Sequence, residues 1–204
     1  MTIDDRKERE KEILRRKILD TAMRLFVEEG YENVSMRKIA AIIEYSPTTI
    51  YRFFESKEDL LRTMSAESYK VLSDRFEIIK AEGSDDPLAT LKSLIREYLR
   101  FGLENPNVYS LYVDLCRMEM GENTMYETVG GVRYKAFHSW YALIEQSVER
   151  EIIKGDDITS ILFLIWNATH GFVIHRIQHP DLPWKPLEED IDALIDMIFG
   201  GLEK

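Results

Sequence analysis

Hydrophobic residues recur at helical spacing along nearly the whole chain. Within 35–57, two short helices flank a tight break. No stretch alternates as a strand would, so the pattern predicts an all-α protein of about nine helices. The longer helices are expected at 13–29, 57–82, 87–104, 106–119, 123–154, 158–177 and 187–202.

Helix boundaries are marked by residues that favour helix starts and stops. Gly30 ends the first helix, and Ser35, Ser46 and Ser56 are expected N-caps of the next three. Asp156 or Asp157 is the expected cap of 158–177. Gly130 and Gly131 predict a kink or a delayed start in 123–154, which Gly155 ends. Residues 1–12 are either a solvated extension of the first helix or a basic arm.

The stretch 35–57 has the spacing of a DNA-binding helix-turn-helix. Ala40 allows a crossing helix to approach, Glu44 lies at the break, and Ile50 is placed to fill the angle between the two helices. Ser46 and Pro47 suit the start of the second helix. Its hydroxyl and cationic side chains suit phosphates and base edges at a helix N-terminus.

We expect base contacts from Thr48, Thr49 and Arg52. We expect phosphate contacts from Ser35, Arg37, Ser46, Pro47 (through its backbone and packing), Tyr51 and Lys57.

This region resembles the DNA-binding domain of the tetracycline-repressor (TetR) family. The matching residues are Ser35, Ile39, Ala40, Ser46, Thr49, Ile50, Tyr51, Phe54, Lys57, Glu58 and Leu60. The family usually has Ala-Gly-Val in the turn, where this chain has Ile43-Glu44-Tyr45. Because Glu adopts a positive φ less readily than Gly, the turn is expected to be reshaped or modestly strained.

The resemblance implies an N-terminal helix-turn-helix domain over 1–62, joined by a long helix to a helical domain over 63–204 that binds a ligand and dimerises. It also implies a transcriptional repressor that binds a palindromic operator as a homodimer. A small lipophilic or aromatic effector would release it. A protein of the same fold that acts through a protein partner, and an all-α enzyme or carrier with a coincidental motif, are the alternatives.

Charge is unevenly distributed along the chain. The net charge is −10, but residues 1–62 contain 13 basic and 13 acidic residues, so all the excess acid lies in 63–204. The predicted DNA-binding part is therefore neutral, and local charge governs phosphate binding. The single cysteine, Cys116, excludes an internal disulfide, and no apolar run is long enough to span a bilayer. We expect a cytoplasmic protein with no membrane partner.

Helix 158–177 is apolar on nearly every side, so in a small domain one side is expected to contact a second chain. The resemblance implies that the last two long helices pair as a four-helix bundle. A monomer core is the alternative. The expected interface residues are Ile161, Ile165, Phe172, Leu194 and Ile198.

Residues 166–171 resemble a Trp-xxx-His-Gly signature of one C-terminal subclass of the family, with Gly171 allowing close helix approach. Aromatic and methionine residues line adaptable apolar sites, although such stripes are also common in simple cores. The candidate ligand-pocket residues are Tyr98, Tyr109, Tyr112, Met118, Tyr126, Phe137, Trp140, Tyr141, Trp166, Asn167 and His170.

Catalytic motifs such as HExxH, GxSxG and a glycine-rich phosphate loop are absent from the sequence, so we expect no enzyme and no cofactor. His175 and His179 are spaced like two metal ligands, but no third ligand is evident, and we expect no metal site.

Overall fold

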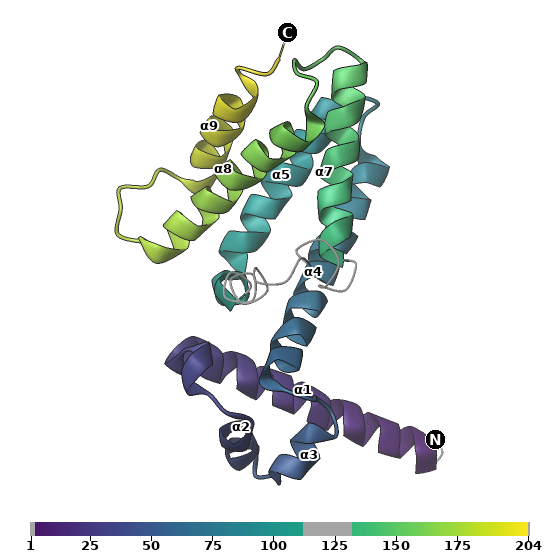
Figure 1. Cartoon of the computed structure of the whole chain (residues 1–204), viewed down its shortest axis with the longest axis vertical. Coiled ribbons are helices and arrows are strands. Elements are labelled where there is room, and N and C mark those ends of the chain that lie inside the picture. The colour runs from purple at the N-terminus through teal and green to yellow at the C-terminus, as the bar shows by residue number, and fades with distance from the viewer. Residues whose placement is uncertain (1–2, 112–131, 204) are drawn as a thin grey trace. The chain divides into compact units, whose positions relative to one another are not determined.

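The computed structural model describes residues 3–111 and 132–203 (Figure 1). These residues form eight α-helices, one 3-10 helix and a further helical stretch at 106–111, with no strand in either described range. The all-α prediction is confirmed. The helices are α1 (Ile3–Glu29), η1 (Tyr31–Asn33), α2 (Met36–Ile43), α3 (Pro47–Tyr51), α4 (Lys57–Glu82), α5 (Pro87–Glu104), α7 (Val132–Glu149), α8 (Ile158–Gln178) and α9 (Leu187–Phe199).

The chain divides into two compact units, and the break follows Glu67 inside α4. The predicted domain boundary after residue 62 also lies inside this helix. We call the part up to Glu67 the N-terminal unit, and the part made of residues 68–109 together with α7, α8 and α9 the C-terminal unit. Residues 4–12 are an exposed part of α1, as the helix-extension hypothesis predicts.

The core of the N-terminal unit is formed by apolar faces of α1, α2 and α3. Ile18 and Ala22 of α1 are fully buried, as are Ile39 of α2 and Ile50 of α3. Ala40 is 1% exposed, so the small residue and the isoleucine of the motif both lie inside, as their spacing predicts. Phe54 is buried as well, whereas Phe53 is only half-buried.

Side-chain caps fix the helix starts. The backbone N–H groups of Lys38, Thr49 and Asp59 donate to the hydroxyls of Ser35, Ser46 and Ser56, at 3.2, 3.1 and 3.1 Å. Each bond satisfies a donor that the first turn of a helix leaves free. The three predicted serine caps are therefore confirmed, and Asp157 rather than Asp156 caps α8.

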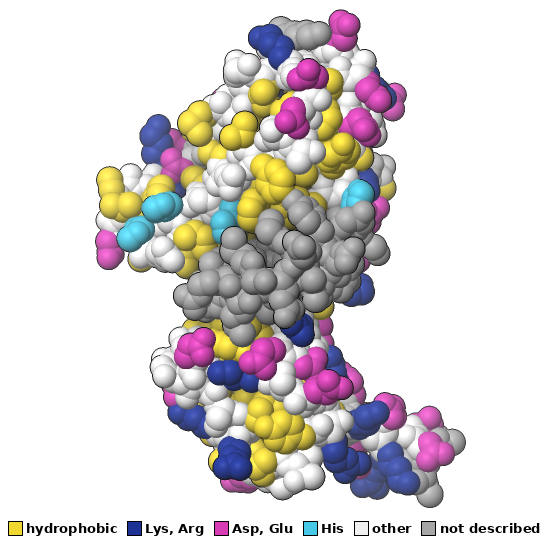
Figure 2. Space-filling model, viewed as in Figure 1, with side chains coloured by type: hydrophobic (Ala, Val, Ile, Leu, Met, Phe, Trp, Pro, Cys, Tyr) yellow, Lys and Arg dark blue, Asp and Glu magenta, His cyan; other side chains and the backbone are white. Residues whose placement is uncertain are grey.

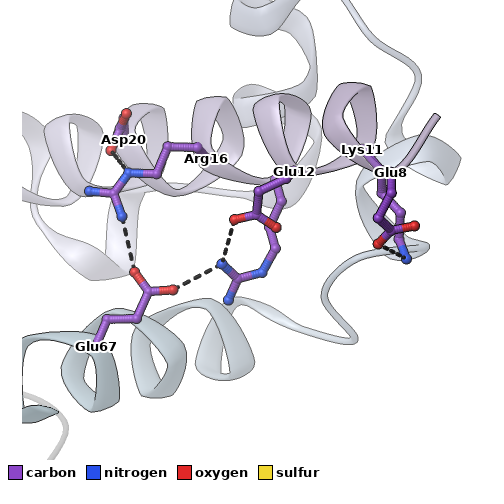
Figure 3. A network of polar contacts seen from close by, with 7 residues as sticks. Glu8, Lys11, Glu12, Arg16, Asp20 and Glu67 are labelled. Carbon is purple, nitrogen blue, oxygen red and sulfur yellow. Dashed lines mark hydrogen bonds and ion pairs between the residues drawn. The ribbon is translucent and has the colours of Figure 1, made fainter. Parts of the chain in front are cut away.

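One carboxylate joins α1 to α4 within the N-terminal unit. Glu67 of α4 accepts hydrogen bonds from Nη1 of Arg15 at 2.9 Å and from Nη1 of Arg16 at 3.1 Å. Arg16 also pairs with Asp20 at 3.1 Å, so the contact is part of a wider network along α1 (Figure 3). Both arginines lie on α1 and the acceptor on α4, so the network holds these two helices together.

In the C-terminal unit, α5 packs against α7, α8 and α9 (Figure 1). Its residues Leu91, Leu94, Ile95 and Leu99 are fully buried. A Cβ on Gly102 would lie 2.8 Å from Cγ1 of Val173, so this glycine allows α5 to approach α8 closely.

The predicted packing role of Gly171 is wrong. Among the described residues, a Cβ at this position would meet nothing within 4 Å, so no described helix packs closely against it. The glycine that close helix packing requires lies on α5 instead of α8.

Two helix ends differ from the prediction, because backbone pairing between chain segments replaces the last helical turns. The predicted helix 123–154 ends at Glu149, and its part before residue 132 lies outside the described residues. Glu151 has a φ of 58°, and the N–H of Lys154 then donates to the carbonyl of Leu202 at 2.7 Å. The same pairing lies just beyond α9. This helix ends at Phe199, three residues before its predicted end.

Among the described helices, α8 alone is long and apolar enough to cross a membrane by length and composition. This is weak evidence, because core helices of soluble proteins have the same properties.

Candidate DNA-binding and ligand-binding sites

Helix α3 presents a polar outer surface on a buried anchor. Ile50 is fully buried, while Thr48 and Arg52 are exposed and Tyr51 is 52% exposed. The hydroxyls of Ser46 and Thr49 lie 2.9 Å apart, so the start of the helix is held by its own polar side chains. The helix therefore offers hydroxyls, a phenol and a guanidinium to a partner without exposing its apolar face.

The turn between α2 and α3 contains a left-handed residue. Glu44 has φ 64° and ψ 40°, and its N–H donates to the carbonyl of Ala41 at 3.2 Å. This conformation is disfavoured for a residue with a Cβ by roughly 1–2 kcal/mol. The turn therefore stays tight and is strained. Modest strain is one of the two outcomes expected for Glu in place of Gly.

Lys17 of α1 supports this turn, a contact that was not predicted from the sequence. Its Nζ donates to the carbonyl of Ile43 at 3.1 Å and lies 5.6 Å from the ring centroid of Tyr45. A cation is favoured at the carboxyl end of a helix, where carbonyls are unsatisfied. Because 26 positions separate Lys17 from Ile43, no local pattern could have revealed the contact.

The basic side chains near α3 differ in their availability. Arg37 and Arg52 are exposed and make no side-chain hydrogen bond or ion pair within the described ranges. Lys38 instead forms an ion pair with Glu29. The two arginines are thus available for phosphate or base contacts at no cost in internal bonds.

Lys57 is placed at the start of α4 by contacts with Tyr31. Its Nζ donates to the Tyr31 carbonyl at 2.8 Å and lies 4.0 Å above the Tyr31 ring. The Tyr31 hydroxyl donates to Glu58 at 3.0 Å. Burial and this carboxylate raise the pKa of Tyr31 far above its usual range, so the phenol stays protonated as a donor.

The C-terminal unit contains a cluster of aromatic residues from α5, α7 and α8 and the stretch at 106–111. We call Tyr98, Tyr109, Phe137, Trp140, Trp166 and His170 the aromatic cluster. A hydrogen-bonded chain runs through it. The hydroxyls of Tyr98 and Tyr109 are 2.7 Å apart, and the Tyr109 hydroxyl lies 2.6 Å from Nδ1 of His170.

Ring contacts complete the aromatic cluster. Trp166 stacks on His170 with centroids 5.2 Å apart, and Phe137 packs edge-on against Trp166 at 5.6 Å. Trp140 meets Tyr98 edge-on at 5.4 Å. Figure 2 shows further hydrophobic side chains gathered over the C-terminal unit. Six predicted pocket residues, which come from different segments of the chain, are therefore linked by a continuous series of contacts.

Two other predicted pocket residues, Asn167 and Tyr141, make no such contact among the described residues. Asn167 is exposed on α8, and Tyr141 is half-buried without a ring contact to another described aromatic residue. Tyr112, Met118 and Tyr126 lie outside the described residues.

The structure alters the predicted dimer face. Ile161 and Ile165 are 7% and 1% exposed, so they belong to the core of their own chain. They are not available to a partner, because α5 and the other helices of the unit already cover their side of α8. Leu194 is also buried, while Phe172 and Ile198 are half-buried. On α8 and α9, the large apolar side chains that remain exposed are Leu164 and Met197, at 68% and 70%.

His175 and His179 stack on each other with centroids 5.7 Å apart at the exposed end of α8. No group of three His, Cys, Asp or Glu side chains that could hold a metal ion occurs among the described residues.

Comparison with known proteins places the helix-turn-helix in a family. Residues 18–64 match the family model described as bacterial regulatory proteins, tetR family. An HTH-type transcriptional regulator of Staphylococcus aureus strain USA300 is 36% identical over 169 residues, which cover 81% of this chain and 83% of that protein.

Two solved structures share the fold over nearly the whole chain. The TetR family transcriptional regulator PfmR from Thermus thermophilus has a TM-score of 0.70 and 26% identity, over 92% of this chain and 99% of that one. The ketosteroid transcriptional regulator KstR2 of Mycobacterium tuberculosis has a TM-score of 0.70 and 19% identity, over 93% and 95%. These relatives are transcriptional regulators and not enzymes.

Proposed function

Because the chain belongs to the TetR family of DNA-binding transcriptional regulators, we propose that it is a ligand-responsive repressor that binds a palindromic operator as a homodimer. The observation that carries this proposal is the pairing of an exposed polar recognition helix with an aromatic cluster in a separate unit. The first suits DNA and the second suits a small apolar molecule.

The DNA contacts follow from the exposure of α3 and its neighbours. Thr48, Thr49 and Arg52 would contact base edges in the major groove. Phosphates would be bound by Arg37, Tyr51 and Lys57, together with the helix starts at Ser35 and at Ser46-Pro47. In a two-fold dimer, two copies of α3 would reach half-sites about 34 Å apart, or a multiple of that distance.

An effector in the C-terminal unit would act by shifting populations. A ligand shifts the equilibrium between two conformations only to the extent that it binds one of them more tightly than the other. Helix α4 is the natural route of coupling, because it begins beside α3 and continues past Glu67 into the C-terminal unit. The conformation favoured by the ligand would hold the two recognition helices at a spacing that does not fit the operator.

The expected effector is lipophilic or aromatic and not strongly anionic. The candidate binding surface is made of aromatic rings, and all the excess acidic charge of the chain lies in residues 63–204. We place the protein in the cytoplasm, where its DNA target lies.

The test is a titration of the purified protein against DNA from upstream of its own gene, at two salt concentrations, with random DNA as competitor. Tight binding that survives the competitor is expected. Binding that both salt and competitor abolish would leave only a nonspecific phosphate interaction and would contradict the proposal. Selection of bound sequences from random DNA would then show whether the protein prefers any specific sequence.

A further inference from the structure

Among the described residues, Nε1 of Trp140 is the only buried side-chain nitrogen or oxygen that has no hydrogen-bond partner. Trp140 is 3% exposed, so its N–H is shielded from solvent, and no described protein group accepts it. A buried polar group without a partner destabilises the fold, and native proteins rarely leave one. Such a group in a candidate ligand site requires an explanation.

The other two tryptophans are in different situations. Nε1 of Trp184 donates to the carbonyl of His179 at 2.8 Å, and Trp184 lies in the loop before α9, away from the aromatic cluster. Trp166 is half-buried at the edge of the aromatic cluster. Trp140 thus combines burial, membership of the aromatic cluster and a donor without an acceptor.

The aromatic cluster, which Trp140 joins through its contact with Tyr98, suits a flat apolar molecule. Phe137 lies three residues earlier on α7 and is half-buried, as are Trp166 and His170 on α8. These three rings expose part of their surface, while the polar atom of Trp140 lies in the interior. A ligand that binds in the aromatic cluster beside Trp140 would meet one N–H donor without a described partner.

We propose that the effector carries an uncharged hydrogen-bond acceptor, a carbonyl or ether oxygen on an aromatic or alicyclic skeleton, and that Trp140 Nε1 donates to this oxygen. The proposal rests on the ligand-binding half of the proposed function. Because Nε1 has no described protein partner to give up, the acceptor gains a hydrogen bond without breaking one. A hydrocarbon of the same shape would leave the N–H unpaired.

The test uses two probes of nearly the same shape, 2-acetylnaphthalene and 2-isopropylnaphthalene, titrated into the full chain without DNA by calorimetry. The wild-type protein should bind the ketone at least about 5-fold more tightly, as expected for one neutral hydrogen bond. Trp140→Phe keeps an aromatic ring and removes the donor, so it should abolish the preference while the hydrocarbon binds as before.

Trp184→Phe is the matched control, because it removes an indole whose N–H is already bonded outside the aromatic cluster. It should keep the preference for the ketone. A preference that survives Trp140→Phe, equal binding of both probes by the wild type, or no binding of either probe would overturn the proposal. If the variant fails to fold, the wild-type comparison of the two probes still decides.

Operator binding by the same wild-type preparation separates this proposal from the proposed function. If the wild type binds both probes equally while operator binding is intact, only the role of Trp140 is refuted. Absence of operator binding with an intact ketone preference would refute the repressor and leave the ligand site standing.

Discussion

Glu44 holds the turn of the helix-turn-helix in a conformation that its own Cβ disfavours. Its φ of 64° is the geometry that glycine adopts readily, and the backbone bonds of the turn keep it there. Nearby, Tyr51 is half exposed on α3 with no internal side-chain bond among the described residues. Glu44 is therefore strained in the protein without DNA, and the Tyr51 hydroxyl is available to donate a hydrogen bond to a partner.

Glu44→Gly should stabilise the N-terminal unit by about 0.5–1 kcal/mol. Relief of the left-handed strain gains roughly 1–2 kcal/mol, and the extra freedom of glycine in the unfolded chain removes part of this. Urea unfolding followed by circular dichroism measures the difference. Ala41→Gly, at an exposed position inside α2, should instead destabilise by about 1 kcal/mol. A destabilising Glu44→Gly would show that the carboxylate side chain contributes to the fold.

Tyr51→Phe should weaken binding to operator and to random DNA alike, by about 0.5–3 kcal/mol, because it removes one phosphate hydrogen bond. Competition titrations measure the two affinities, and stability should be unchanged because the hydroxyl has no internal partner. Tyr45→Phe, in the turn, serves as the control and should have a smaller effect. A loss confined to the operator would mean that Tyr51 reads bases.

At the scale of elements, α1 is held to α4 through Glu67 and two arginines. The side chains of Arg15 and Glu67 are 31% and 39% exposed, so the pair is only partly shielded from solvent. A single ion pair of this kind contributes little to stability, but the contribution is larger when one carboxylate pairs with two cations. Because Glu67 is the last residue of the N-terminal unit, the network joins α1 to the part of α4 that continues into the next unit.

Glu67→Gln should reduce the stability of the N-terminal unit by no more than about 1 kcal/mol at low salt, and the loss should shrink at 1 M salt, where charges are screened within about 3 Å. Thermal or urea unfolding at two salt concentrations measures this. Glu8→Gln removes a single exposed pair with Lys11 and should have no measurable effect. A loss that does not depend on salt would point to packing instead of charge.

At the scale of the whole molecule, α8 contains more apolar surface than one chain covers. Ile161 and Ile165 lie in the core of the C-terminal unit, whereas Leu164 on α8 and Met197 on α9 are exposed. Large apolar side chains exposed on neighbouring helices are typical of an interface between chains. A second copy of the chain would cover them in the proposed homodimer.

Leu164→Lys should therefore convert the proposed dimer to monomers in analytical ultracentrifugation, because the charge would be buried at the interface. The single chain should fold normally, since Leu164 is 68% exposed in it. Ile13→Lys, 59% exposed on α1, is the control and should leave the mass unchanged. Dimers that persist in Leu164→Lys would place the interface elsewhere. Lysine at Ile161 or Ile165 would be uninformative, because it would disrupt the core.

Features that depend on neighbours along the chain were predictable from the sequence. The serine caps, the buried Ala40 and Ile50, the bounds of α5 and the strained turn at Glu44 each follow from contacts within a few residues. Helical periodicity and capping act over one or two turns, so the sequence displays them directly. The helix-turn-helix was predictable for the same reason, since its whole pattern lies within one short stretch.

Only the tertiary structure decided which apolar side chains of α8 face their own chain, which glycine allows close packing, and where α7 ends. These depend on contacts such as Gly102 with Val173 or Lys154 with Leu202, whose partners lie far along the chain. The tertiary structure also brought six aromatic residues together and left Trp140 Nε1 without an acceptor among the described residues. A linear pattern shows that a residue is apolar or aromatic, but its partner is fixed only when the helices pack.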